Sequence, residues 1–189
     1  KKPFFMMISH YALHVRNMSL KGTRKKYLDI VAEREGITQE IPDISRFDEK
    51  AEDMPKKLRS LWEKANYAAM MEDMDTSIGM VLKKLKTLGL EENTYIIFTS
   101  DNGGGSSNAP LQGGKAKMWE GGLRIPMIVV GPGIPENSQC DVPVAQWDYL
   151  PTMHDLSGSK TPLPKDLDGV SLRPVIEKGS AGKLAKRDT

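Results

Sequence analysis

The feature that most constrains the fold is a repeat of apolar side chains between residues 56 and 88, at intervals of three and four. This spacing places the apolar side chains on one face of an α-helix. Lysines occupy the last turns of this segment and Gly89 follows it, as expected where a helix ends. The repeating positions are Leu61, Ala65, Ala68, Met71, Met74, Ile78, Val81, Leu85 and Leu88.

Three short apolar segments predict β-strands. Residues 3–9, 94–99 and 125–130 are apolar, contain β-branched or aromatic side chains, and end in polar or turn-forming residues. Nearly continuous apolar strands separated by a long helix are typical of a parallel sheet that is covered on both faces. We therefore predict an α/β fold with a mostly parallel sheet flanked by helices, in which one βαβ unit carries a long insertion.

Other segments give weaker signals. We predict helices at residues 24–35 and 148–156 and a short edge strand at residues 142–144. Residues 16–56 are strongly charged, and we interpret them as a solvated insertion. Residues 176–189 are charged and contain glycine, and we expect them to form a flexible tail.

Composition argues against several classes of protein. The chain has 27 Lys and Arg against 25 Asp and Glu, so its formal charge of +2 does not indicate nucleic-acid binding. Its longest apolar run, near residues 125–130, is too short for a membrane span. The single cysteine, Cys140, cannot form an internal disulfide, and its sequence neighbours give no reason to expect a reactive thiol.

Reactive side chains follow the predicted strands. Asp101 and Asn102 come directly after strand 94–99, and their oxygen atoms suit calcium or magnesium. Lys115 lies in the following loop beside two glycines, where an ammonium group could neutralise an anion. His14 follows strand 3–9 and could act as a general acid. Ligands of open α/β sheets gather at the carboxyl ends of the strands, which makes these side chains candidates.

Each of these signals has an ordinary structural explanation as well. An Asp-Asn pair before glycines also forms a turn, and a lysine in a glycine loop is often only a surface residue. His14, like His10 and His154, could serve as a hydrogen-bonded structural residue. The sequence contains no P-loop, no Gly-x-Ser-x-Gly elbow, no His-Glu-x-x-His motif and no CxxC pair.

In their order along the chain and in their amino-acid sequence, however, the segments resemble the arylsulfatase-type sulfatase family of the alkaline-phosphatase-like superfamily. The resemblance covers roughly residues 3–14 and 62–175. It is carried by Phe4–His14, Tyr67–Asp75, Ile96–Gly104, Gly113–Pro126, Val142–Thr152 and Leu167–Leu172.

The resemblance implies a role for each candidate residue. Asp101 and Asn102 would be calcium ligands, with magnesium as the alternative metal. Lys115 would hold a sulfate oxygen, and His14 would contact the ester oxygen and help to protonate the leaving alcohol. The implied partner is a sulfate-ester small molecule or a sulfated glycan, and the implied location is the periplasm or the outside of the cell.

The sequence also departs from the family pattern. It has no Cys/Ser-x-Pro-x-Arg motif, whose Cys or Ser becomes the formylglycine nucleophile of the family. The early Asp pair of the calcium site and the upstream Arg, Lys and His of the sulfate pocket are also not in the chain. All of these belong to the N-terminal half of the family's catalytic domain. Residues 1–175 are therefore expected to be the C-terminal half of that domain, with residues 176–189 leading toward a small C-terminal subdomain.

Three functional hypotheses remain open at this point. The first is a sulfuric ester hydrolase whose formylglycine lies outside this chain, so that the chain alone is inactive and self-associates through exposed strand edges. The second is a phosphonate or phosphate monoester hydrolase of the same superfamily. The third is a truncated binding module without catalytic activity.

Overall fold

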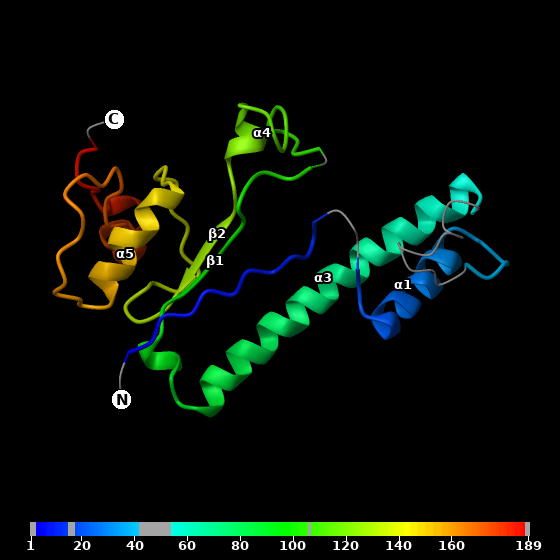
Figure 1. Cartoon of the computed structure of the whole chain (residues 1–189), viewed down its shortest axis with the longest axis horizontal. Coiled ribbons are helices and arrows are strands. Elements are labelled where there is room, and N and C mark those ends of the chain that lie inside the picture. Colours follow the sequence, from blue (N-terminus) through cyan, green and yellow to red (C-terminus); the bar gives the residue numbers. More distant parts are fainter. Residues whose placement is uncertain (1–2, 15–17, 42–53, 106, 188–189) are drawn as a thin grey trace. The chain divides into compact units, whose positions relative to one another are not determined.

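The computed structural model describes residues 3–14, 18–41, 54–105 and 107–187. They form two compact units, Lys1–Leu88 and Gly89–Thr189, each of which is described by itself (Figure 1). None of the described helices is both long enough and apolar enough to cross a membrane.

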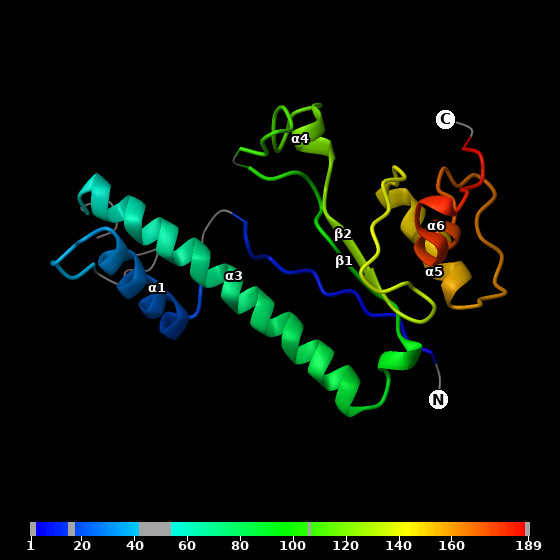
Figure 2. The ribbon, with the colours of Figure 1, turned by 180° about the vertical axis from the view of Figure 1, so that it is seen from behind.

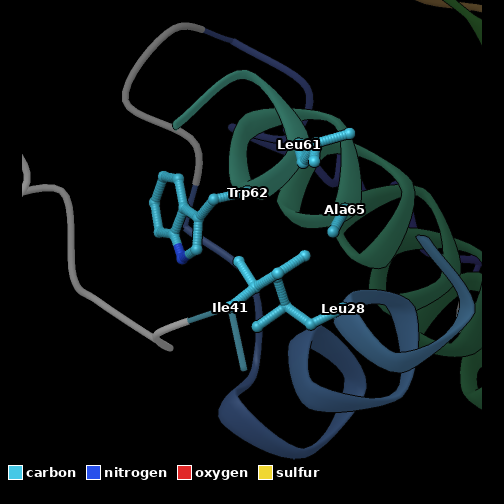
Figure 3. Packing of buried hydrophobic residues seen from close by; sticks show 5 residues of the cluster. All are labelled: Leu28, Ile41, Leu61, Trp62 and Ala65. Carbon is cyan, nitrogen blue, oxygen red and sulfur yellow. The ribbon is translucent and has the colours of Figure 1, made fainter. Parts of the chain in front are cut away.

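The first unit is built around two helices, α1 (Lys21–Arg34) and α3 (Lys56–Thr87). The helix predicted over residues 56–88 is confirmed as α3, and the helix predicted over residues 24–35 is confirmed as most of α1. Apolar side chains of both helices meet in one cluster (Figure 3). The predicted repeat matches the buried face of α3 only in part, because Ala69 and Met70 are buried whereas Met71 is 49% exposed. The buried members of this cluster are Leu28, Ile41, Leu61, Trp62 and Ala65.

Polar contacts also join α1 to α3. The Asp73 carboxylate accepts hydrogen bonds from the backbone N–H of Leu20 and the hydroxyl of Thr23, both at 2.7 Å, at the end of α1 where backbone donors lack partners within the helix. Lys26 donates to Glu72 at 2.5 Å, and this bond holds the pKa of the Glu72 carboxyl below its ordinary value. The described part of the predicted insertion at 16–56 thus includes a packed helix, while residues 42–53 lie outside the described residues.

Residues 3–9, predicted as a buried strand, are extended but belong to no ladder among the described residues. Their side chains are exposed, with Phe5 70% and Met7 77% accessible. A strand buries its side chains only where neighbouring strands and a covering layer exist, and this unit is made of helices.

The second half of α3 is also largely exposed, with Met80 68% accessible. This half lies beyond α1, which covers only the first half of α3 (Figure 1).

The second unit contains a small sheet of two strands, β1 (Ile96–Thr99) and β2 (Met127–Val130). The short 3-10 helix η1 (Glu91–Asn93) precedes β1. The two strands pair antiparallel, with Ile96 opposite Val130 and Thr99 opposite Met127. The α/β class is confirmed, but the sheet of the described residues is antiparallel rather than mostly parallel, and it contains no βαβ unit. The reason is the connection between the strands, which contains only the short helix α4 (Glu120–Leu123) and returns without crossing over.

Two further helices, α5 (Tyr149–Leu156) and α6 (Arg173–Lys178), lie beside one another in this unit (Figure 2). The predicted helix at 148–156 is confirmed as α5, whereas residues 142–144 form no strand. The 3-10 helix η2 (Gln146–Asp148) leads directly into α5.

The carboxylate of Asp148 is fully buried and joins the end of the chain to η2. It accepts hydrogen bonds from the backbone N–H groups of Ala145 at 2.8 Å and Val170 at 3.0 Å, and it pairs with Arg187 Nη2 at 2.6 Å. Residues 176–187, expected to be a flexible tail, contain the end of α6, the 3-10 helix η3 (Gly179–Ala181) and this ion pair. A buried carboxylate with several donors fixes the geometry of the backbone around it.

We expect the isolated chain to self-associate through its exposed apolar segment. Residues 4–8 are consecutive large apolar side chains in extended conformation, each about half exposed or more. Light scattering of the purified chain should show oligomers at high concentration, and the double variant Phe5→Ser/Met7→Ser should shift the distribution toward monomer. A monodisperse monomer for the unaltered chain would contradict this expectation.

Candidate active site

The candidate site begins where β1 ends. Asp101 and Asn102 follow that strand with their side chains in contact, because Asn102 Nδ2 donates to Asp101 Oδ2 at 2.6 Å. The Ser100 hydroxyl donates to the backbone carbonyl of Asn102 at 3.0 Å and closes the turn. Asp101 is exposed and Asn102 is half-buried. The pair therefore presents a carboxylate and an amide together at the end of a strand, as predicted from its position in the sequence.

The loop that carries Lys115 folds back onto the residues following this pair. Lys115 donates its backbone N–H to the carbonyl of Gly104 at 2.9 Å, and Gly103 donates to the carbonyl of Gly122 at 3.1 Å. The side-chain amide of Asn108 links the same two parts of the loop, because it donates to the carbonyls of Gly104 at 2.9 Å and Gly121 at 3.0 Å. The backbone of Lys115 is thus bonded directly to Gly104, which lies two residues after Asn102.

Glycine is required where these segments cross. A Cβ on Gly122 would lie 2.1 Å from the carbonyl oxygen of Lys117 and 2.5 Å from that of Gly114. A Cβ on Gly103 would lie 2.2 Å from the carbonyl oxygen of Gly121. The obstructing atoms are backbone atoms, which cannot turn aside as a side chain can. The glycine-rich sequence around Lys115 is therefore explained by close backbone packing.

The side chain of Lys115 is free to bind an anion. It is exposed, and the structure gives its ammonium group no hydrogen-bond or ion-pair partner within the described part of the chain. Gly113, two residues earlier, has a φ of 78°, which a residue with a side chain rarely adopts. The backbone thus turns sharply just before Lys115, and its positive charge remains uncompensated.

The donors of Asp101 and Asn102 fit part of a divalent-cation site. Both offer hard oxygen atoms, and calcium takes about six to eight such ligands. The amide nitrogen of Asn102 now faces the Asp101 carboxylate, so binding a cation between them requires the amide to turn its oxygen inward. Among the residues that the structure describes, no three His, Cys, Asp or Glu side chains gather as a metal site. The pair can therefore supply two ligands of a shell that needs more.

The remaining candidates lie elsewhere. His14 belongs to the first unit, where it is exposed and lies 5.4 Å from Tyr11 between ring centroids. His154 Nε2 is 2.6 Å from the carbonyl oxygen of Thr161, which agrees with a structural role. Cys140 is an exposed free thiol. A pocket of about 270 Å³ beside Arg187 is lined by residues 165–168, 170, 186 and 187, and it contains no predicted site residue.

Sequence reasoning missed two residues that hold the end of β1. Gln146 donates its side-chain amide to the backbone carbonyls of Ser100 at 3.0 Å and Asp101 at 3.3 Å. The Tyr149 hydroxyl donates to Thr99 Oγ1 at 3.1 Å. No local pattern reveals contacts between residues so far apart in sequence. The sequence predicted a strand at 142–144 and a helix at 148–156, but neither prediction indicated that Gln146 and Tyr149 contact the end of β1.

Comparison with solved structures identifies the class of fold. A structure from the locus for metabolism of multiple glycosaminoglycans in Bacteroides thetaiotaomicron aligns with a TM-score of 0.66 and 25% identity. The alignment covers 98% of this chain and 36% of that one. The fold is that of the alkaline-phosphatase-like sulfatases.

Comparison with sequences identifies the family. The sulfatase family model matches residues 1–159, so the chain belongs to the sulfatase family. A sulfatase of Formosa agariphila is 36% identical over 94% of this chain and 30% of its own length. The steryl-sulfatase of Rattus norvegicus is 37% identical over 58% of this chain and 21% of its own length. The chain thus spans less than a third of the length of these curated relatives.

Proposed function

We propose that the protein containing this chain is a sulfuric ester hydrolase, and that the chain is the C-terminal half of its catalytic domain. The observation that carries this proposal is the loop in which Lys115 is hydrogen-bonded to Gly104, close behind Asp101 and Asn102. It joins the loop of Lys115 to the segment that follows Asp101 and Asn102, and it supports our assignment of these three residues to one site. Membership of the sulfatase family supports the same conclusion.

Each residue of the arrangement then has a chemical task. The unpaired ammonium of Lys115 binds an oxygen of the sulfate group and stabilises the negative charge that builds up during transfer. Asp101 and Asn102 would hold a cation through their oxygen atoms. Calcium, when bound there, supplies positive charge beside the sulfate group. The formylglycine nucleophile would be contributed by residues outside this chain. His14 belongs to the first unit and not to this arrangement, and its proposed role as proton donor to the leaving alcohol rests on the family resemblance alone.

The proposed substrate is a sulfate-ester small molecule or a sulfated glycan. This class is supported by the steryl-sulfatase of Rattus norvegicus and by the N-acetylgalactosamine-6-sulfatase of Mus musculus, which is 34% identical over 61% of this chain. A periplasmic or secreted location is proposed with it, on the ground of the family alone. Phosphate or phosphonate monoester hydrolysis remains the second candidate, because a lysine and a cation suit either oxyanion equally well.

The proposal is tested by comparing an aryl sulfate with the matching aryl phosphate. We expect the protein that contains this chain to hydrolyse the sulfate far faster in the presence of calcium. We expect the isolated 189-residue chain to hydrolyse neither ester, because the nucleophile is outside it. Faster hydrolysis of the phosphate would favour the second candidate, and sulfate hydrolysis by the isolated chain would contradict the assignment of the nucleophile.

A further inference from the structure

One side-chain amide connects η2 to the candidate cation ligands. Gln146 Nε2 is 3.0 Å from the carbonyl oxygen of Ser100 and 3.3 Å from that of Asp101. The same NH₂ group thus bridges the two consecutive carbonyls that lead into the Asp-Asn pair. These carbonyls belong to the irregular segment directly after β1, where no strand partner orients them.

Gln146 begins η2, and several hydrogen bonds fix the position of this turn. The next residue but one, Asp148, is fully buried and receives backbone hydrogen bonds from Ala145 and Val170 as well as the ion pair from Arg187. Tyr149 follows and donates to Thr99 Oγ1, and that hydroxyl in turn donates to the carbonyl of Pro126 at 3.0 Å. The turn is therefore connected to β1 through Thr99 and, through the same hydroxyl, to Pro126 directly before β2, so the position of Gln146 is well defined.

The contact orients the backbone of Asp101 more than it adds stability. Gln146 is exposed, and a hydrogen bond of this kind contributes only about 0.5–1.5 kcal/mol to folding. By contrast, losing a group that orients a metal ligand typically lowers metal affinity about 10- to 100-fold. The two carbonyls belong to the peptide planes before and after the Cα of Asp101, so a change in their orientation would turn the direction of the Asp101 side chain.

We propose that Gln146 is a positioning residue that orients Asp101 and Asn102 for cation binding. This inference rests on the proposed function, because it assigns the cation to that pair. Gln146 does not touch the cation or the substrate. It acts only through the two backbone carbonyls, and so its loss weakens cation binding without removing any ligand.

The test is isothermal titration calorimetry of calcium with the protein that contains this chain. Gln146→Met keeps the size of the side chain but removes the donor, and we expect it to raise the Kd for calcium about 10- to 100-fold. The matched control is Gln139→Met, since the Gln139 amide donates to the carboxylate of the exposed Asp141, at 3.3 Å, and not to the segment after β1. The control should leave the Kd unchanged, and both variants should unfold at nearly the wild-type temperature.

The outcomes separate this inference from the proposed function. An unchanged Kd in Gln146→Met overturns the positioning role, as does a wild-type protein that does not bind calcium. A raised Kd in a protein that hydrolyses no sulfate ester supports the positioning role and contradicts the proposed function. A raised Kd together with kcat restored at saturating calcium supports both.

Discussion

Replacing Lys115 with alanine is expected to lower kcat/KM for a sulfate ester about 100- to 1000-fold, which is the usual cost of losing one group that stabilises a developing oxyanion. The Lys115 ammonium has no partner in the described part of the chain, so its charge is available to the substrate. Its backbone bond to Gly104 does not involve the side chain and survives the substitution. Steady-state kinetics of the protein that contains this chain measure the effect.

Lys117→Ala is the matched control for this prediction. Lys117 is exposed, lies two residues further along the same loop, and also donates its backbone N–H to a loop carbonyl, that of Gly114 at 3.0 Å. Its substitution removes the same charge and should change kcat/KM by less than a few fold. Equal losses in the two variants would show that Lys115 contributes only to the overall positive charge of the loop and does not bind the substrate directly.

Replacing Gly122 with alanine is expected to disrupt the loop itself. The new methyl group would lie 2.1 Å from the Lys117 carbonyl oxygen, and forcing extra atoms into a packed region costs about 1–3 kcal/mol or more. Because the backbone must move to make room, Lys115 should also be displaced and activity should fall with stability. Urea unfolding of the protein that contains this chain measures the loss of stability.

Gly105→Ala provides the comparison for Gly122. A Cβ on Gly105 meets nothing within 4 Å, although this glycine belongs to the same glycine run after Asn102. The substitution should change the free energy of unfolding by less than about 0.5 kcal/mol. A Gly122→Ala protein as stable as the Gly105→Ala protein would mean that the close crossing of the loop does not exist.

Local periodicity predicted the helices well. The three- and four-residue repeat on α3 reports only on residues one turn apart, and the structure ends the helix one residue before the predicted end, with Gly89 at a φ of 62°. β-branched composition likewise located β1 and β2. These features depend on neighbours in sequence, which is why the sequence was sufficient.

The direction of the sheet and the burial of residues 3–9 could not be predicted in the same way. Strand direction depends on how the chain returns between 99 and 127, and here it returns through a folded loop rather than a crossover helix. Burial of residues 3–9 depends on partners that no local pattern specifies.

The candidate site shows the same division. Asp101, Asn102 and Lys115 could be proposed from their motifs, whereas Gln146 contacts Asp101 across 45 residues and has no local signal. A contact of this range is set by the packing of η2 on the sheet. Only the structure reveals it, and only the structure explains why glycines surround Lys115.

The most direct test of the central claim is a crystal structure of the protein that contains this chain, grown with calcium and sulfate, with the ion located by anomalous scattering. We expect calcium about 2.3–2.6 Å from a carboxylate oxygen of Asp101 and from Oδ1 of Asn102. We expect a sulfate oxygen within hydrogen-bonding distance of Lys115 Nζ. Calcium bound by other residues, with the side chains of Asp101 and Asn102 left in solvent, would contradict the assignment.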